Sequence, residues 1–449
     1  MDTSNSINIR RLIDDQPVSG YQKWVVFLGF LIIALDGLDV AIIGFIAPQL
    51  KSEWGLGPQD LGPVLSAALI GLALGALVAG PLADRYGRKL VLLGSVLLFG
   101  GWTLASAFAA NLETLVALRF LTGLGLGAAM PNASTLVSEY APTRSRSLLI
   151  TLAFCGFSLG AALGGFASAW MIPNLGWRSV LVLGGVLPLL VAPLLYWRLP
   201  ESVTFLVRQG ADPERIRAIV RRLAPERVGP GTVFTLPAAV TAGGGAVGTI
   251  LSPGYRFGTL MLWGGYILAL FLVYLFSGWL PTLVKEGGGY SVAEAAIVTA
   301  CFQIGGPVGA ISVGWAMDRW NPQRVLMLAF VFSGAVIFAI GQVAGAFAWL
   351  CVIAWAVGFG LNGASVGMNA LAAAFYPVEV RATGASWMSG IGRLGAILSA
   401  FAGAQMLAAG WSFAQVFASL LIPAGLAALA VLLQGRQTGR SAPVAVRAR

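Results

Sequence analysis

The run LGFLIIALDGLDVAIIGFIAP, residues 28–48, is long and apolar, yet it contains two aspartates, Asp36 and Asp39. A helix that crosses a bilayer needs about 20 predominantly apolar residues. A carboxylate at membrane depth is costly, so it is rarely kept for packing alone. The i, i+3 spacing puts both carboxylates on one face of a helix. The run therefore predicts a transmembrane helix that carries a buried acidic pair.

The composition extends this prediction to the rest of the chain. Of 449 residues, 57% are hydrophobic and only 10% are charged, whereas a soluble domain is about 25% charged. We predict an all-α membrane protein whose twelve transmembrane helices form two pseudo-symmetric six-helix bundles. The twelve predicted spans are 24–47, 61–83, 90–110, 112–138, 147–170, 177–198, 256–282, 293–317, 323–345, 347–374, 383–408 and 411–433.

The net charge of +10 follows the predicted topology. If the N-terminus is inside, 23 Lys and Arg residues lie on the cytoplasmic side, and three, Lys51, Arg178 and Lys285, lie outside. This asymmetry predicts a multi-pass protein of the cell (inner) membrane with both termini in the cytoplasm. It also makes nucleic acid an unnecessary explanation for the basic charge. Residues 1–23 contain no apolar core of a signal peptide, so we expect a cytoplasmic tail.

The chain shows no pattern of metal or redox chemistry. It has no His, and Cys155, Cys301 and Cys351 lie in three different predicted spans without metal-ligand or redox spacing. We expect no metal and no cofactor other than a proton gradient. Tryptophans at predicted span ends are expected to anchor the helices at the membrane interface. These are Trp24, Trp177, Trp349 and Trp411.

An internal repeat divides the chain into two halves. The motif GPLADRYGRK at 80–89 returns in degenerate form as GWAMDRWNPQ at 314–323. Two parallel six-span halves around a central cavity are a recurring plan of transporters. The Arg-rich and Gly/Pro-rich stretch 199–255 lies between the halves. The predicted parts are a tail at 1–23, a bundle at 24–198, a cytoplasmic loop at 199–255, a bundle at 256–433 and a tail at 434–449.

These motifs resemble the major facilitator superfamily over roughly residues 24–433. GPLADRYGRK matches that superfamily's signature between its second and third spans, and the degenerate copy lies between spans eight and nine. Within the superfamily the chain is similar to the aromatic acid:proton symporters. That narrower resemblance is carried by Asp36-Gly37-Leu38-Asp39, by Phe375-Tyr-Pro-Val-Glu-Val-Arg-Ala-Thr-Gly384 and by Gly392-Arg393. Related sugar and metabolite carriers share parts of it, including Pro200-Glu201-Ser202.

Arg119 is predicted to lie at the same membrane depth as the two aspartates. Counted at 1.5 Å per residue, Asp36 and Asp39 are roughly 18 and 22 Å from the cytoplasmic edge, and Arg119 is about 20 Å from it. Because buried charges seek partners, we infer that Arg119 lies near Asp36 or Asp39. Desolvation and mutual repulsion would favour proton uptake by the acidic pair, which we predict to couple transport to protons. The structural alternative is that the pair only neutralises Arg119.

The predicted substrate contacts begin with the two intramembrane arginines. A guanidinium suits a carboxylate ligand because it forms bidentate hydrogen bonds and stays charged. The alternatives are a purely structural ion pair for Arg119 and bonds to helix carbonyls for Arg393. Aromatic and polar side chains of the later spans could contact a ring, although such residues more often only pack. The predicted substrate-binding residues are Arg119, Arg393, Tyr266, Gln303, Asn362 and Trp387.

The resemblance implies a cytoplasmic gating network around the two signature loops. Ion pairs there would form in one conformation and break in the other, and Gly80 and Gly87 would permit close helix approach and a tight turn. A static surface loop is the alternative. The predicted gating residues are Gly80, Asp84, Arg85, Gly87, Arg88, Glu139, Arg144, Asp318, Arg319, Glu379 and Arg381.

The function predicted from these features is proton-coupled import of small aromatic carboxylates such as hydroxybenzoates, by a carrier in the lipid bilayer. The resemblance to the superfamily implies that the carrier works as a monomer. The same fold could carry a sugar, a dicarboxylate or an exported drug. A sensor that binds aromatic acids without transport stays open, whereas an enzyme is disfavoured because no catalytic constellation is present. The ring substituents and the proton stoichiometry are not readable from the residues.

Overall fold

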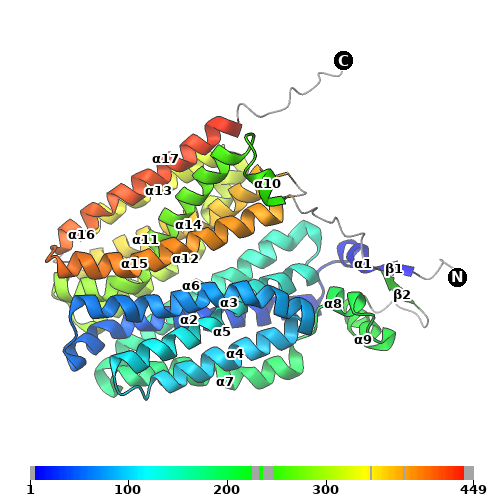
Figure 1. Cartoon of the computed structure of the whole chain (residues 1–449), viewed down its shortest axis with the longest axis horizontal. Helices are drawn as coiled ribbons and strands as arrows, with labels where there is room; N and C mark the ends of the chain where they lie inside the picture. The colour runs from blue at the N-terminus through cyan, green and yellow to red at the C-terminus, as the bar shows by residue number, and fades with distance from the viewer. Residues whose placement is uncertain (1–5, 225–231, 236–245, 344–345, 378–379, 439–449) are drawn as a thin grey trace. The chain divides into compact units, whose positions relative to one another are not determined.

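The computed structural model describes residues 6–224, 232–235, 246–343, 346–377 and 380–438. Within them, twelve helical segments are long and apolar enough to cross a membrane. They are α2 (Gly20–Trp54), α3 (Leu61–Tyr86), α4 (Arg88–Ser106), α5 (Leu112–Tyr140), α6 (Arg146–Leu175), α7 (Trp177–Arg198), α11 (Arg256–Gly288), α12 (Val292–Arg319), α13 (Pro322–Ile340), α14 (Phe347–Phe375), α15 (Arg381–Ala408) and the pair α16 (Phe413–Ser419) and α17 (Leu421–Thr438) (Figure 1).

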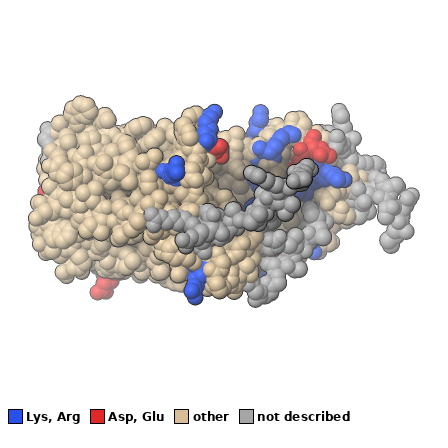
Figure 2. All heavy atoms as spheres, turned by 90° about the horizontal axis from the view of Figure 1, so that it is seen from above, with Lys and Arg blue, Asp and Glu red and all other residues tan. Residues whose placement is uncertain are grey.

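The prediction of twelve spans is confirmed, with different ends. The first helix runs from Gly20 to Trp54 and is longer than the apolar run that predicted it, because a helix continues into the polar interface. The twelfth span is two helices that meet at Leu420. Pro423 lies in the first turn of the second helix, where its missing N–H is tolerated. Figure 2 shows that charged side chains are sparse on the face it views, as lipid contact requires.

Several short elements lie outside the spans, and sequence analysis did not predict them. They are β1 (Ser6–Asn8), α1 (Ile9–Asp15), α8 (Val203–Arg208), α9 (Pro213–Leu223), β2 (Val233–Thr235) and α10 (Ala246–Ile250), with single 3₁₀ turns at Pro58–Asp60 and Thr143–Ser145. Strands β1 and β2 pair in parallel with Ser6 opposite Val233. Each strand is too short for a recognisable alternation. The expected tail at 1–23 is therefore a folded segment from Ser6 to Asp15.

Tertiary burial explains why this N-terminal segment folds. Ile9 and Leu12 of α1 belong to the same buried apolar cluster as Val220 and Leu223 of α9. Neither helix is long enough to be stable alone in water. Figure 1 places α1, β1, β2, α8 and α9 together at one end of the neighbouring spans. The segment is therefore stabilised by burial in an apolar cluster that includes residues far away in the sequence.

The described chain falls into two compact units. Unit 1 comprises Met1–Val40, Ile70–Ala161 and Leu181–Val240, and unit 2 comprises Ala41–Leu69, Ala162–Val180 and Thr241–Arg449. The boundaries cut across α2, α3, α6 and α7. The division into two six-span bundles at 199–255 therefore remains a prediction.

Glycines bring pairs of helices into backbone contact in both units. In unit 1, a Cβ at Gly71 or Gly75 of α3 would lie closer than 3.0 Å to a carbonyl oxygen of α5. In unit 2, a Cβ at Gly305 or Gly309 of α12 would meet carbonyl oxygens of α14 in the same way. The two glycine pairs occupy equivalent positions of the sequence repeat, each the same distance before its copy of the signature motif. Small residues at such positions let membrane helices gain close van der Waals contact.

The three basic residues predicted to lie outside are held at helix ends of unit 2. Lys51 pairs with Glu286 at 2.7 Å, Arg178 pairs with Glu53 at 2.7 Å, and Lys285 donates to the Pro48 carbonyl at 3.2 Å. Trp177, expected to be an interfacial anchor, is instead 1% exposed. Its indole N–H donates to Glu53 at 2.8 Å, so the ring is a packed part of the helix end.

A matched pair of substitutions on α12 tests the glycine contacts. Gly309→Ala places a methyl group against the Phe359 carbonyl, whereas Gly314→Ala meets no atom within 4 Å. Overpacking of this kind costs about 1–3 kcal/mol, whereas alanine in an open helix position stabilises by up to about 1 kcal/mol. We expect G309A to lower the midpoint of thermal unfolding in detergent by several degrees and G314A to leave it unchanged or raise it. Equal midpoints for the two variants would contradict the contact.

Candidate functional site

An ion pair between Arg119 of α5 and Asp39 of α2 is buried in unit 1. Both side chains are 0% exposed. The Nη2 atom of Arg119 contacts Oδ2 of Asp39, Nη1 donates to Oδ1 at 3.3 Å, and Nη2 also reaches the Asp39 carbonyl oxygen at 3.4 Å. The prediction that Arg119 lies beside one of the two aspartates is confirmed. The arrangement is the two-pronged one that a guanidinium forms with a carboxylate.

Thr103 of α4 completes this cluster, and sequence analysis missed it. Its hydroxyl donates to Oδ1 of Asp39 and accepts from Nη1 of Arg119 at 3.2 Å. The side chain is fully buried. A hydroxyl can donate and accept at once, so it satisfies both charged partners. The available signal was a threonine inside an apolar run, but such residues commonly bond their own helix and point to no partner.

Close packing of α2 against α6 sets the position of the acidic pair. A Cβ at Gly37 would lie closer than 3.0 Å to the backbone of Phe157, and one at Gly160 would meet the Ala34 carbonyl in the same way. Asp36 and Asp39 flank Gly37 and are 1% and 0% exposed. Glycine is therefore needed at position 37 of the Asp-Gly-Leu-Asp motif, because the backbones of α2 and α6 touch there.

The cluster brings together charges that are costly to bury singly. Removing one partner of a buried ion pair leaves the other uncompensated and typically costs about 3–5 kcal/mol. Nε of Arg119 is buried and has no hydrogen-bond partner among the described residues. The guanidinium thus retains a donor that the described part of the protein does not use.

The first predicted gating loop is an ion-pair network at one end of unit 1. Arg88 pairs with Asp84 at 2.8 Å and approaches Glu139 of α5 at 3.9 Å. Glu139 also accepts a hydrogen bond from the Ser202 hydroxyl. The turn between α3 and α4, the end of α5 and the connection between α7 and α8 therefore meet here. Arg85 lies apart from this network, with its guanidinium 5.3 Å from the centre of the Tyr86 ring.

Glu201 organises the same network and was not among the predicted gating residues. Its carboxylate accepts from the backbone N–H groups of Arg88 at 2.8 Å and Lys89 at 3.2 Å. A negative charge at the first turn of α4 satisfies free donors and complements the helix dipole. Gly87 precedes that turn with φ +94°, and a Cβ there would strike the Glu201 carboxylate. The tight turn expected at Gly87 is therefore present and specifically needs glycine.

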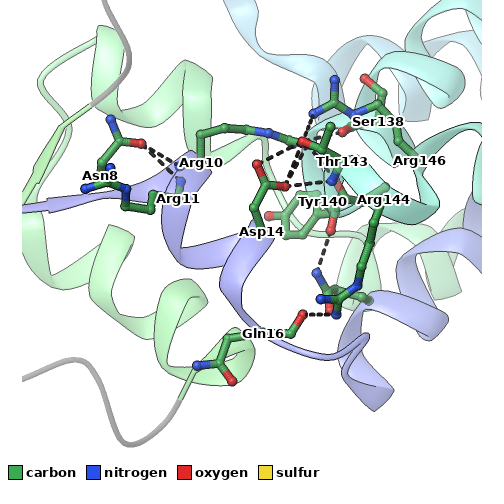
Figure 3. Close-up of polar contacts among 12 residues, drawn as sticks. Asn8, Arg10, Arg11, Asp14, Gln16, Ser138, Tyr140, Thr143, Arg144 and Arg146 are labelled. Carbon is green, nitrogen blue, oxygen red and sulfur yellow. Dashed lines mark hydrogen bonds and ion pairs between the residues drawn. The ribbon is translucent and has the colours of Figure 1, made fainter.

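The N-terminal segment clamps the connection between α5 and α6 (Figure 3). Arg144, a predicted gating residue, donates to the carbonyl of Gln16 at 2.6 Å. Asp14 accepts from the Thr143 backbone N–H at 2.6 Å. Burial alone would raise the pKa of Asp14, but its bonds to Thr143 and Arg10 together hold that pKa below the usual value. The carboxylate is therefore charged at neutral pH and keeps the clamp closed.

The remaining predicted gating residues form no such network in the described structure. Asp318, Arg319 and Arg381 are exposed at helix ends of unit 2, and Arg319 stacks on Trp315 at 3.9 Å. Glu379 lies outside the described residues. A Cβ at Gly80 meets no described atom within 4 Å, so the close helix approach expected there stays a prediction.

The predicted substrate contacts of unit 2 lie on several helices. Gln303 of α12 is buried and donates to the Ser277 hydroxyl at 3.3 Å, whereas Asn362 bonds the Gly358 carbonyl of its own helix at 3.3 Å. Arg393 of α15 is partly buried. Any shared role of Gln303, Asn362 and Arg393 in binding stays a prediction.

An aromatic cluster joins α11, α14 and α15. The rings of Trp263 and Trp387 stack with centroids 5.9 Å apart, and the Tyr266 hydroxyl accepts from Asn369 at 3.2 Å. Gly392, the neighbour of Arg393, has no room for a Cβ because the Tyr266 ring lies against it. The indole N–H of Trp263 is buried without a hydrogen-bond partner among the described residues. Two predicted residues, Tyr266 and Trp387, thus belong to one cluster with an unused donor.

Comparison with known proteins shows a close sequence relationship over almost the whole chain. A family model described as Major Facilitator Superfamily matches residues 29–291 and 262–448. The chain is 51% identical to the 4-hydroxybenzoate transporter PcaK of Pseudomonas aeruginosa, with 96% of each chain covered. It is 49% identical to a gallate transporter of Pseudomonas putida, with 97% of each covered. It is 36% identical to the 3-(3-hydroxy-phenyl)propionate transporter of Escherichia coli, covering 96% of this chain and 98% of that one.

Solved structures share the fold at much lower sequence identity. An inward open conformation of the xylose transporter XylE from E. coli superposes with a TM-score of 0.71 at 18% identity, over 91% of this chain and 95% of that one. A D-xylose-proton symporter gives a TM-score of 0.69 at 18% identity, over 92% and 97%. Similarity at this level shows the fold alone.

A double-mutant cycle tests the buried ion pair. Asp39→Asn removes the carboxylate that is bonded to Arg119, and Arg119→Gln removes the guanidinium that is bonded to Asp39, so each is expected to destabilise the protein by about 3–5 kcal/mol. The double variant removes both charges and is expected to unfold at a higher temperature than either single variant. The measurement is the thermal unfolding midpoint in detergent. Additive losses would show that the two side chains are not coupled.

Proposed function

The chain belongs to the major facilitator superfamily, and on that premise we propose that it is a secondary active transporter that imports small aromatic carboxylates, of the hydroxybenzoate kind, by proton symport. Support for the substrate class comes from relatives named as carriers of 4-hydroxybenzoate and gallate, at 51% and 49% identity. These acids share a ring, a carboxylate and hydroxyl groups. Membership in the superfamily sets aside the membrane-enzyme alternative.

The single observation that carries the coupling proposal is the buried Asp39–Arg119 ion pair one helical turn from Asp36. Two carboxylates and one guanidinium carry one excess negative charge. In a site of low dielectric that excess is costly, and one proton on the acidic pair removes it. With no histidine in the chain, carboxylates are the remaining groups suited to this task. The coupling role therefore falls to Asp36 and Asp39 together.

The proposed cycle uses the proton to release the arginine. Protonation of the acidic pair weakens its hold on Arg119, whose guanidinium then becomes available to the substrate carboxylate. Arg119 is fully buried in this structure, so binding requires that release and a local rearrangement. Its unused Nε donor supports this role. After the substrate leaves, the proton follows and Arg119 returns to Asp39, as alternating access requires.

We assign the contacts to the aromatic ring to the cluster of Trp263, Tyr266 and Trp387 in unit 2. The flat faces of the tryptophans offer stacking surface, and the indole N–H of Trp263 can donate to a ring hydroxyl. Arg393 is a second candidate for an anionic group because it adjoins this cluster in sequence. The roles of Gln303 and Asn362 rest on their position in spans alone.

The proposed setting is the cell inner membrane, with both termini in the cytoplasm and the monomer as the working unit. The 23-to-3 distribution of Lys and Arg supports this orientation. The ion pairs among Asp84, Arg88 and Glu139 would then face the cytoplasm, where their formation and rupture would gate access.

Uptake by purified protein in liposomes tests the transport proposal. We expect an inward proton gradient to drive accumulation of radiolabelled 4-hydroxybenzoate, and Asp36→Asn and Asp39→Asn to lower that accumulation at least tenfold. Counterflow needs no net proton movement, so Asp36→Asn should retain it, which also serves as the folding control. Gradient-driven accumulation by both variants would show that the pair does not couple transport. If the protein binds 4-hydroxybenzoate but moves none of it into the liposomes at any proton gradient, the alternative of a sensor without transport would be favoured.

A comparison of acid and ester tests whether Arg119 recognises the carboxylate. Arg119→Lys keeps the charge but loses the bidentate geometry. We expect the variant to weaken binding of 4-hydroxybenzoate about tenfold or more while binding of its methyl ester, already weak in the parent protein, changes little. Competition against labelled substrate measures both. Equal losses for acid and ester would assign Arg119 to structure alone.

A further inference from the structure

A cavity of about 380 Å³ lies in unit 1, away from the Asp39–Arg119 pair. Its lining residues are Tyr21, Trp24, Leu194, Arg198 and Arg222. They come from three elements, the beginning of α2, the end of α7 and the helix α9 of the segment between the two sequence halves. The volume falls in the range of small-molecule sites. Nothing in the proposed transport cycle uses this cavity.

The polar part of the cavity is positively charged. Arg198 and Arg222 both line it, and no acidic side chain of the described residues does. Neither guanidinium forms an ion pair with a carboxylate of the described residues; Arg222 instead lies over the Tyr21 ring at 5.6 Å. Two arginines that converge from different elements match the geometry and charge of a phosphate group. The occupant is therefore expected to carry an anionic head.

The other side of the cavity is apolar and continues along the spans. Trp24 and Leu194 each lie about one helical turn farther into their span than Tyr21 and Arg198. The Phe27 ring stacks on Trp24 at 5.3 Å and is 45% exposed. Trp197, next to Arg198, is 75% exposed. Exposed aromatic rings at the end of a span are typical of the level of lipid headgroups. The occupant should thus combine an anionic head with an apolar body.

The helix that supplies Arg222 is held firmly over the spans. Val220 and Leu223 of α9 are buried in the cluster that includes Ile9 and Leu12 of α1. The clamp between Asp14 and Thr143 fastens α1 to the beginning of α6 (Figure 3). The Arg222 side chain is exposed, and its backbone lies in the last turn of α9 between the buried residues Val220 and Leu223. The N-terminal segment therefore helps to build the cavity even though it does not line it.

We propose that this cavity binds the phosphate headgroup of an anionic phospholipid, with the acyl chains lying along Trp24, Phe27 and Leu194. A free anion such as inorganic phosphate would use the same guanidinium contacts but not the apolar strip, so the strip favours the lipid. The proposal requires only that the helices span a membrane. It does not depend on the substrate or on proton coupling.

Native mass spectrometry of the full chain released from mixed micelles tests the site. Phosphatidylglycerol and phosphatidylcholine are titrated separately. We expect one phosphatidylglycerol to bind with clear preference, and Arg198→Gln/Arg222→Gln to weaken that binding about thirtyfold, the effect of two arginines near a lipid surface. The matched control is Arg215→Gln/Arg221→Gln, which removes the same charge from exposed positions of α9 outside the cavity. The control should bind as the parent protein does.

Three outcomes would overturn the proposal. Equal weakening in both double variants would indicate general charge attraction. Equal affinity for the two lipids in the parent protein would exclude an anion site. Finally, inorganic phosphate at millimolar concentration, or 4-hydroxybenzoate, could protect the parent protein against thermal unfolding as well as the lipid does. That result would assign the cavity to a free anion. Retained unfolding midpoints in both double variants would show that folding is intact, as expected for exposed side chains.

Discussion

An arginine inside an apolar bundle must be neutralised and hydrogen-bonded, and much of unit 1 is arranged to meet that requirement. Asp39 supplies the charge, Thr103 supplies a hydroxyl that serves both partners, and three different helices are thereby fixed to one another. Gly37 lets α2 press against α6, which determines where the carboxylates lie. Such a pair is weak evidence for stability, because hydrophobic residues would often serve as well. The proposed coupling cycle gives this buried pair a task that needs a charge able to change partners.

A second level of organisation lies at one end of unit 1, where carboxylates meet helix termini and arginines. Glu201 caps α4, Arg88 bridges Asp84 and Glu139, and the N-terminal segment closes over the connection between α5 and α6. These contacts are partly exposed, so each is worth little alone. Together they connect the signature loop with three other segments. The cavity lined by Arg198 and Arg222 adjoins this level through α9, and the proposed lipid would bind at the same end of the unit.

The two sequence halves share a helix-packing scheme but not a charged apparatus. Glycines at equivalent positions of the repeat bring α3 to α5 in unit 1 and α12 to α14 in unit 2, so the repeat is visible as backbone contact. The buried ion pair has no such copy, since the repeat maps Asp36 onto Leu270 and Arg119 onto Ala354. Unit 2 offers an aromatic cluster instead. The duplicated helix packing and the different polar groups agree with the proposal that unit 1 binds the proton and the carboxylate and unit 2 binds the aromatic ring.

The residues by themselves determined the number of spans and the repeat, because apolar length and helical rise are local quantities. They also limited Arg119 to two partners, since a buried charge inside an apolar span has few to choose from. Only the tertiary structure decided that Asp39 is the partner of Arg119, and only it added Thr103 and Glu201 to the two networks. It also showed that an expected tail folds, since Ile9 and Leu12 are buried in one apolar cluster with residues far along the chain, including Val220 and Leu223. Which face of a helix meets which neighbour depends on packing across the whole bundle, and periodicity within one helix does not contain that information.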